Sequence, residues 1–195
     1  MSIMTVAEMT ETLKSRLKEN RFRHSLGVAE TAAELAARFG VDENKAYLAG
    51  LLHDCARQYK NEDLPAEAKK RGIPIGQVEE TLPLLLHAYV GAKLVGEVYG
   101  VTDGDITQAI WRHTVGGENM TKLDKIIYFA DMTEPNRDYP EAEELRQFAR
   151  EKSLDEMMLK GLSESIKFVI EKNQPIHPMT VAARNEILAN LRLKK

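Results

Sequence analysis

Residues 42–57 read DENKAYLAGLLHDCAR, an apolar stretch at helical spacing that ends on a histidine followed directly by an aspartate. Asp42 is a typical helix N-cap, and the pattern after it predicts one helix through to Cys55. Neighbouring residues on a helix are about 100° apart around its axis. His53 and Asp54 can therefore present a nitrogen and a carboxylate to one divalent metal ion. A His-Asp pair is also common at ordinary helix ends, so the dipeptide needs support from elsewhere in the chain.

Helical spacing continues on both sides of this stretch, and no segment alternates with the two-residue period of a strand. Gly40 is a typical helix C-terminus, Thr121 with Asp124 forms a typical capping pair, and Thr180 can cap the last helix. The sequence predicts helices over 5–20, 22–39, 43–55, 62–71, 82–99, from Thr102 or Asp103 onward, and over 123–131, 141–150, 154–173 and 181–191. Without repeats or a linker, we expect an all-α bundle in a single domain over residues 1–195.

The composition excludes several classes of protein. With 195 residues, 43% hydrophobic and 29% charged, the chain is typical of a globular domain with a full core. A net charge of -3 does not favour a nucleic-acid partner, and one cysteine, Cys55, cannot form an internal disulfide. The acidic N-terminal segment is unlike a signal peptide, and charged residues interrupt the apolar run 82–98, which argues against a membrane span. We expect a cytoplasmic protein.

Four further polar residues lie within apolar helical segments. Asp131 follows an apolar run, where an unpaired carboxylate is costly to bury, so it must be protonated, paired with a cation or bound to a metal. His24, His87 and His113 also have mainly apolar neighbours along their helices. A single histidine of this kind is usually a satisfied core residue. Because four of the five histidines share the pattern, we expect them to converge on one site.

Five segments together resemble one family of proteins. They are RFRHSLGVAETAAELA (21–36), GLLHDCAR (50–57), HTVG (113–116), DKIIYFADMTEPNR (124–137) and IHPMTVAARN (176–185). The chain resembles the YqeK family of HD-domain proteins, which are symmetrical bis(5'-nucleosyl)-tetraphosphatases. The H…HD…D pattern alone is shared by the whole HD superfamily, whereas the other segments are more specific. The resemblance implies hydrolysis of diadenosine tetraphosphate (Ap4A) at its central phosphoanhydride, giving two ADP.

The resemblance also implies the roles of individual residues. The metal ligands would be His24, His53, Asp54 and Asp131, holding iron, with manganese, cobalt or magnesium as alternatives and a second, weaker ion as an option. From their residue types rather than from the resemblance, we expect Asp54, Arg57, His87 and His113 to be the catalytic residues. Contacts to the nucleotide substrate would fall on Arg21, His24, Asp54, Cys55, Ala56, Arg57, His87, His113, Thr114, Asp131, Arg137, Ile176, His177, Pro178, Met179 and Thr180.

Several alternatives stay open at this level. His87 and His113 can hold a second metal ion, or they can donate hydrogen bonds to the phosphates with one acting as general acid. The metal ligands do not separate Ap4A hydrolysis from another HD-type nucleotide phosphohydrolase, and a non-catalytic nucleotide sensor is a third option. A homodimer is compatible with the sequence but not required by it.

Overall fold

The computed structural model describes residues 4–193, and these residues form helices with no strand among them. The expected all-α class is therefore confirmed. The elements in chain order are α1 (Val6–Arg16), α2 (Glu19–Phe39), α3 (Glu43–Leu52), the 3-10 helix η1 (Cys55–Gln58), α4 (Leu64–Lys70), α5 (Gln77–Thr81), the 3-10 helix η2 (Pro83–Leu85), α6 (Leu86–Tyr99), α7 (Gly104–Arg112), α8 (Lys122–Thr133), α9 (Pro140–Ala149), α10 (Leu154–Glu171) and α11 (Pro178–Leu193).

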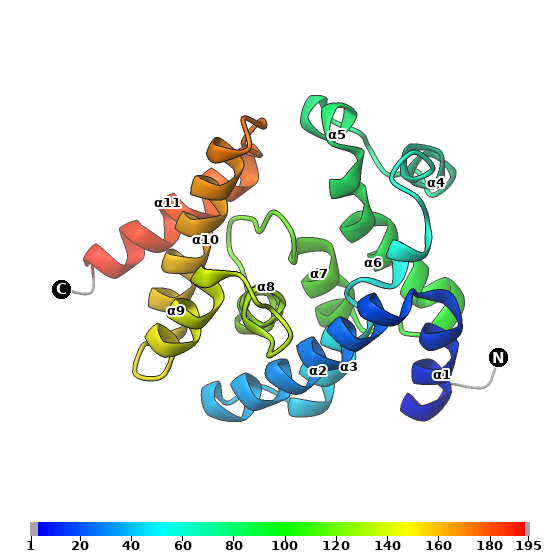
Figure 1. Ribbon diagram of the computed structural model, residues 1–195, viewed down its shortest axis with the longest axis horizontal. Helices are drawn as coiled ribbons and strands as arrows, with labels where there is room; N and C mark the ends of the chain where they lie inside the picture. The colour runs from blue at the N-terminus through cyan, green and yellow to red at the C-terminus, as the bar shows by residue number, and fades with distance from the viewer. Residues whose placement is uncertain (1–3, 194–195) are drawn as a thin grey trace.

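The helices form two groups that share a central helix (Figure 1). α2, α3, α7 and α8 pack together in the middle, with α4 to α6 on one side and α9 to α11 on the other. α8 contributes Ile126 and Ile127 to one buried apolar cluster and Tyr128 and Phe129 to a second cluster with α9, α10 and α11. α8 therefore connects the two parts of the core. The single domain over 1–195 stays a prediction, because its ends lie outside the described residues.

Several predicted helix ends are confirmed. Gly40 ends α2 with a φ of 67°, a left-handed conformation that glycine adopts without a steric penalty. The Asp42 side chain accepts hydrogen bonds from the first backbone N–H groups of α3, and Asp103, rather than Thr102, caps α7 in the same way. Thr121 and Asp124 form the expected reciprocal capping box at the start of α8. Local side-chain chemistry decides these boundaries.

Other predicted boundaries are wrong. The first helix ends at Arg16 rather than Asn20, because Leu17 and Lys18 are extended, and α2 begins at Glu19. No glycine or proline marks this break; it turns the chain so that Leu17 can be buried, which local helix propensity does not predict.

The helix starts near Pro83 and Pro178 also differ from the prediction. The run 82–99 is divided, since the 3-10 helix η2 covers Pro83–Leu85 and α6 begins only at Leu86. Thr180 does not cap the last helix, because α11 already begins at Pro178, a residue suited to the first helical turn. The buried Thr180 hydroxyl instead donates to the carbonyl of Val115 and joins α11 to the segment after α7.

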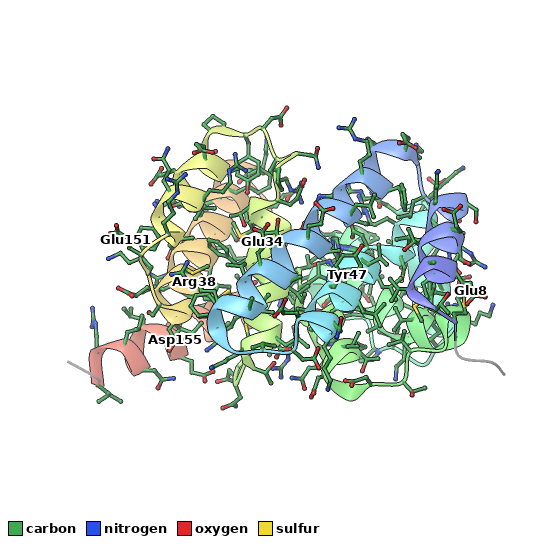
Figure 2. The ribbon with its side chains drawn as sticks, turned by 90° about the horizontal axis from the view of Figure 1, so that it is seen from below. Glu8, Glu34, Arg38, Tyr47, Glu151 and Asp155 are labelled. Atoms are coloured by element: carbon green, nitrogen blue, oxygen red, sulfur yellow. The ribbon has the colours of Figure 1, made fainter. Side chains whose placement is uncertain are left out.

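α2 makes two close contacts, one with α3 and one with the turn between α9 and α10. A Cβ atom at Gly50 would lie 2.8 Å from the Cα atom of Ala29, so only glycine lets α3 approach α2 this closely. At the far end of α2, the Arg38 guanidinium donates to the carbonyls of Ala149 and Lys152, and Figure 2 shows Arg38 reaching toward the α9–α10 turn.

Of the helices within residues 4–193, none is long and apolar enough to cross a membrane.

Candidate active site

Two histidines and two aspartates from three different helical segments meet at the centre of the protein. His24 Nε2 lies 3.0 Å from Asp131 Oδ1 and 3.9 Å from Asp54 Oδ2, and His53 Nε2 lies 3.8 Å and 3.5 Å from the same two oxygens. Ligand atoms around an ion at about 2.0–2.2 Å are separated by similar distances. The chain therefore brings together all four residues that the sequence suggested as metal ligands, although this geometry alone does not establish an ion.

The His-Asp pair does not sit on one regular helix, contrary to the prediction. α3 ends at Leu52, and His53 follows as its C-cap. Asp54 is no longer helical, with φ -103° and ψ 16°, and η1 begins at the next residue. The pair therefore lies at a helix-to-helix turn. This turn directs both side chains toward His24 and Asp131 rather than along one helix face.

Hydrogen bonds to the Nδ1 atoms orient four of the histidine rings. His53, His87 and His113 each donate from Nδ1 to the carbonyl three residues earlier, at 2.7, 2.5 and 2.7 Å. His24 Nδ1 donates to the Glu134 carboxylate oxygen Oε1 at 3.0 Å. Because Nδ1 carries the donated proton, the neutral form of each ring presents its Nε2 lone pair to the centre. The buried Nε2 atoms of His24 and His53 make no hydrogen bond, which leaves both available to a cation.

His87 and His113 form a second pair beside Asp54. Their Nε2 atoms are 3.0 Å apart, and His87 Nε2 lies 3.2 Å from Asp54 Oδ1 and 3.3 Å from the Thr114 hydroxyl. Two lone pairs cannot face each other at this distance without repulsion, so a proton or a cation between them stabilises the pair. His53, Asp54 and His113 also lie close enough together to be a second candidate metal-binding group. Both roles considered for these histidines therefore remain open.

The surroundings keep Asp54 ionised and His113 neutral. Burial acts to raise the pKa of Asp54, but His53 and His87 outweigh it and hold the pKa well below its usual range. Burial lowers the pKa of His113 to about 3, and the charges of His53 and His87 act in the same direction. Asp54 therefore offers a negative charge to this pair of histidines.

Two of the expected arginines reach this centre from its solvent side. Arg21 donates to Asp54 Oδ2 at 2.7 Å, and Arg137 donates to Asp131 Oδ1 at 2.6 Å. Each arginine side chain is 32% exposed, and Asp131 is 21% exposed, so the site is open to solvent here. Arg57 is half-buried and donates to Asn61, with no carboxylate contact of its own. The guanidinium groups of Arg21 and Arg137 can thus meet an anion that approaches the two aspartates.

The last expected segment, residues 176–180, leads into α11, which begins at Pro178. His177 precedes the helix and donates from Nε2 to Glu79 Oε1 at 3.0 Å, while its Nδ1 accepts from the N–H of Met179. Glu79 also accepts from the Tyr89 hydroxyl at 3.3 Å. Both ring nitrogens of His177 are thereby occupied. None of the side-chain hydrogen bonds or ion pairs of these described residues reaches the four central histidines.

Cys55 and Ala56 are fully buried, and the Cys55 thiol donates to the carbonyl of Gly91. Burial raises the pKa of this thiol above its ordinary value. Their side chains lie in the core, so only their backbone groups can meet a substrate. The sequence prediction did not distinguish backbone from side-chain contacts at these two positions.

Sequence reasoning missed two buried glutamates that hold histidines of the site. Glu134 contacts His24, and Glu79 contacts His177. Glu134 is the C-cap of α8 and Glu79 lies in the short helix α5, and neither belongs to the metal, catalytic or substrate residues that the sequence predicted. The nearest available signal was Glu134 itself, a carboxylate three residues after Asp131 and next to Pro135, but the sequence does not say which way it points.

A groove of about 590 Å³ lies away from this centre, among α9, α10 and α11. Its lining mixes apolar, basic and acidic side chains, including Phe148, Leu159, Lys160, Lys167, Arg184 and Glu164. None of the residues expected to bind metal or nucleotide lines it. The chemistry-bearing side chains therefore gather at the α2–α3–α8 centre and not at this groove.

Comparisons with known proteins agree on one family. The HD domain model matches residues 21–136. A Bacillus subtilis protein named "Bis(5'-nucleosyl)-tetraphosphatase, symmetrical" is 38% identical, over 95% of this chain and 99% of its own. A protein of the same name from Halalkalibacterium halodurans is 40% identical, over 95% and 98%. A crystal structure from Clostridium acetobutylicum, described as a "predicted HD superfamily hydrolase involved in NAD metabolism", has a TM-score of 0.91 at 38% identity, covering 97% of this chain and 100% of that one.

Proposed function

This chain belongs to the HD-domain family, among the symmetrical bis(5'-nucleosyl)-tetraphosphatases, and on that premise we propose that it hydrolyses Ap4A to two ADP. The enzyme is a metal-dependent phosphoric anhydride hydrolase. The observation that carries the proposal is the convergence of His24, His53, Asp54 and Asp131, with two buried ring nitrogens that lack hydrogen bonds and face two carboxylates. Related dinucleoside polyphosphates belong to the same substrate class.

These four residues would hold the metal. Two neutral imidazoles and two carboxylates suit a borderline divalent ion, and we propose iron, with manganese, cobalt or magnesium as alternatives. Such an ion supplies the Lewis acidity that activates water and polarises a phosphoryl oxygen. A second, weaker ion would be held by His87, His113 and Asp54 Oδ1, because the one free nitrogen of His53 faces the first ion.

The protein's own groups bind the polyphosphate and move protons. Arg21 and Arg137, which now pair with Asp54 and Asp131, would turn toward the phosphate oxygens and neutralise their charge. The ionised Asp54 would accept a hydrogen bond from the attacking water and orient it toward the phosphorus atom. Arg57, in η1, would add a further positive charge that neutralises the phosphate oxygens.

His87 is placed to protonate the departing ADP. Its Nε2 lies between Asp54, His113 and Thr114, where a shared proton is stabilised by the carboxylate. A proton delivered to the leaving phosphate oxygen lowers the cost of breaking the anhydride. His113, whose pKa is lowered, would stay neutral and leave this proton on His87 Nε2, the nitrogen proposed to face the substrate.

The nucleoside parts of the substrate would meet the segment around His177. Ile176, Pro178, Met179 and Thr180 follow the family motif and lie at the start of α11, which His177 joins to α5 through Glu79. We also propose that the backbone at Cys55 and Ala56, rather than their side chains, contributes to binding. A cytoplasmic location belongs to the proposal, because nucleotides are made and used there, and a homodimer stays a prediction.

Product identification tests the function. Purified protein loaded with iron or manganese is incubated with Ap4A, and the nucleotides are separated by anion-exchange chromatography. We expect ADP alone. AMP together with ATP would overturn symmetrical cleavage, and faster turnover of a nucleoside triphosphate or a guanosine polyphosphate than of Ap4A would favour another HD-type phosphohydrolase. Binding of Ap4A without any product would favour the nucleotide sensor.

A further inference from the structure

Glu134 is a buried carboxylate at the C-terminus of α8, three residues after Asp131, and only 1% of it is exposed. A charged group in this position is costly unless hydrogen bonds satisfy both of its oxygens. Oε1 lies 3.0 Å from His24 Nδ1, and Oε2 accepts from the backbone N–H and the side-chain amide of Asn136, at 2.7 and 2.8 Å. The carboxylate is therefore fully engaged, with His24 as its one ring partner.

Helix α2 leaves room for this carboxylate. A Cβ atom at Gly27, one turn after His24, would lie 2.3 Å from Glu134 Oε2 and 3.0 Å from the Asn136 amide nitrogen. Glycine inside a helix costs roughly 0.5–1 kcal/mol relative to alanine. The absence of a side chain at Gly27 thus has a direct structural purpose, which is to let Glu134 reach His24 Nδ1.

His24 differs from the other central histidines in the charge of its Nδ1 acceptor. His53, His87 and His113 donate to neutral carbonyls of their own helical segments, whereas His24 donates to a carboxylate from a different helix. A carboxylate acceptor fixes the ring tautomer and makes the opposite nitrogen a stronger ligand. That nitrogen, His24 Nε2, is buried, makes no hydrogen bond and faces Asp131 and Asp54.

We infer that Glu134 is a positioning residue for the metal centre, which holds His24 with Nε2 directed at the ion and strengthens it as a ligand. The inference rests on the metal site of the proposed function, and goes beyond it by assigning a role to Glu134, Gly27 and Asn136. Glu134 does not itself touch the ion or the substrate. Its loss should therefore weaken metal binding first and substrate binding little.

The test measures metal affinity directly. Mn²⁺ is titrated by calorimetry into the full chain after chelator treatment, for the wild type, Glu134→Ala and Glu134→Gln. We expect Glu134→Ala to weaken Mn²⁺ binding by about 10–100-fold, the usual effect of removing such a partner. Glutamine can still accept a hydrogen bond from His24, but its amide group then faces the N–H of Asn136. The Mn²⁺ affinity of Glu134→Gln should therefore lie between those of the wild type and Glu134→Ala.

Glu79→Ala is the matched control, because it removes another buried glutamate bound to a histidine, His177, away from the four metal ligands. We expect its Mn²⁺ affinity to match the wild type. At saturating Mn²⁺ the KM of Glu134→Gln for Ap4A should stay within about two-fold of the wild type, while helical circular dichroism of all variants is unchanged. Unchanged Mn²⁺ affinity in both Glu134 variants, or an equal loss in Glu79→Ala, would overturn the inference. The titration needs no turnover, so failure of the Ap4A assay would not affect its outcome.

Discussion

Glu134–His24 and Glu79–His177 are two buried glutamate–histidine pairs with the same 3.0 Å separation, in two regions that differ in construction. The first pair joins α8 to α2 within the central group of helices, and Glu134 is held by Asn136 and accommodated by Gly27. The second joins the short helix α5 to the residue before α11, and the His177 side chain is 12% exposed, close to the 8% of His24.

The two pairs also differ in what they leave available on the histidine. In His24 the carboxylate occupies Nδ1 and leaves Nε2 without a hydrogen bond at the candidate metal centre. In His177 both nitrogens are occupied, one by Glu79 and one by the N–H of Met179. The same contact thus prepares a ligand atom in one region and fixes a segment of chain in the other. We expect the first region to control metal binding and the second to control substrate binding.

The largest expected effect is at the shared centre of the first region. Asp54→Ala removes a carboxylate that faces both His24 and His53, and should lower kcat for Ap4A by roughly 1000-fold, as for loss of a preorganised active-site charge. Steady-state kinetics at saturating manganese measures this, with circular dichroism as the control for folding. Turnover within ten-fold of the wild type would show that the chemistry lies elsewhere.

A smaller effect sharpens the role of the buried pair in that region. Gly27→Ala introduces a methyl group where Glu134 Oε2 now lies, so the carboxylate must withdraw from His24. We expect Mn²⁺ affinity to fall by about ten-fold or more, as for other losses of a ligand's hydrogen-bond partner. Overpacking should cost about 1–3 kcal/mol of unfolding free energy, partly offset by the roughly 0.5–1 kcal/mol that alanine gains over glycine inside a helix.

Gly104→Ala is the control for that substitution, because a Cβ atom at Gly104 would have open space around it. Its unfolding free energy in urea should change by less than about 1 kcal/mol and its Mn²⁺ affinity not at all. If Gly27→Ala bound Mn²⁺ as tightly as Gly104→Ala, the space at Gly27 would have no bearing on the metal centre.

The smallest effect is expected in the second region. His177→Ala removes the link to α5 and a proposed contact to the nucleoside, and the loss of about 1 kcal/mol raises KM for Ap4A by about five-fold. Mn²⁺ affinity should not change. A loss of Mn²⁺ affinity in His177→Ala, measured by the same calorimetry, would mean that the two regions are not independent.

The central group of the site could be predicted because polar residues in apolar helices are physically conspicuous. His24, His53 and Asp131 each interrupt an apolar pattern, and buried polar groups need partners. The helix ends at Gly40, Asp42 and Thr121 were also predictable, because capping depends on residues adjacent in sequence. Glu79 and Glu134 carried no such signal, since an acidic residue at a helix end is ordinarily solvated.

The sequence alone therefore determined the all-α class, the helices that carry the polar residues, and the residue types available for binding metal and phosphate. Only the tertiary structure decided that Asp54 lies at a turn, that Gly27 makes room for Glu134, and that His177 is bound to Glu79. The physical reason is that periodicity and capping act over a few residues. The direction of a buried carboxylate instead depends on contacts between segments about 100 residues apart, and no local pattern encodes them.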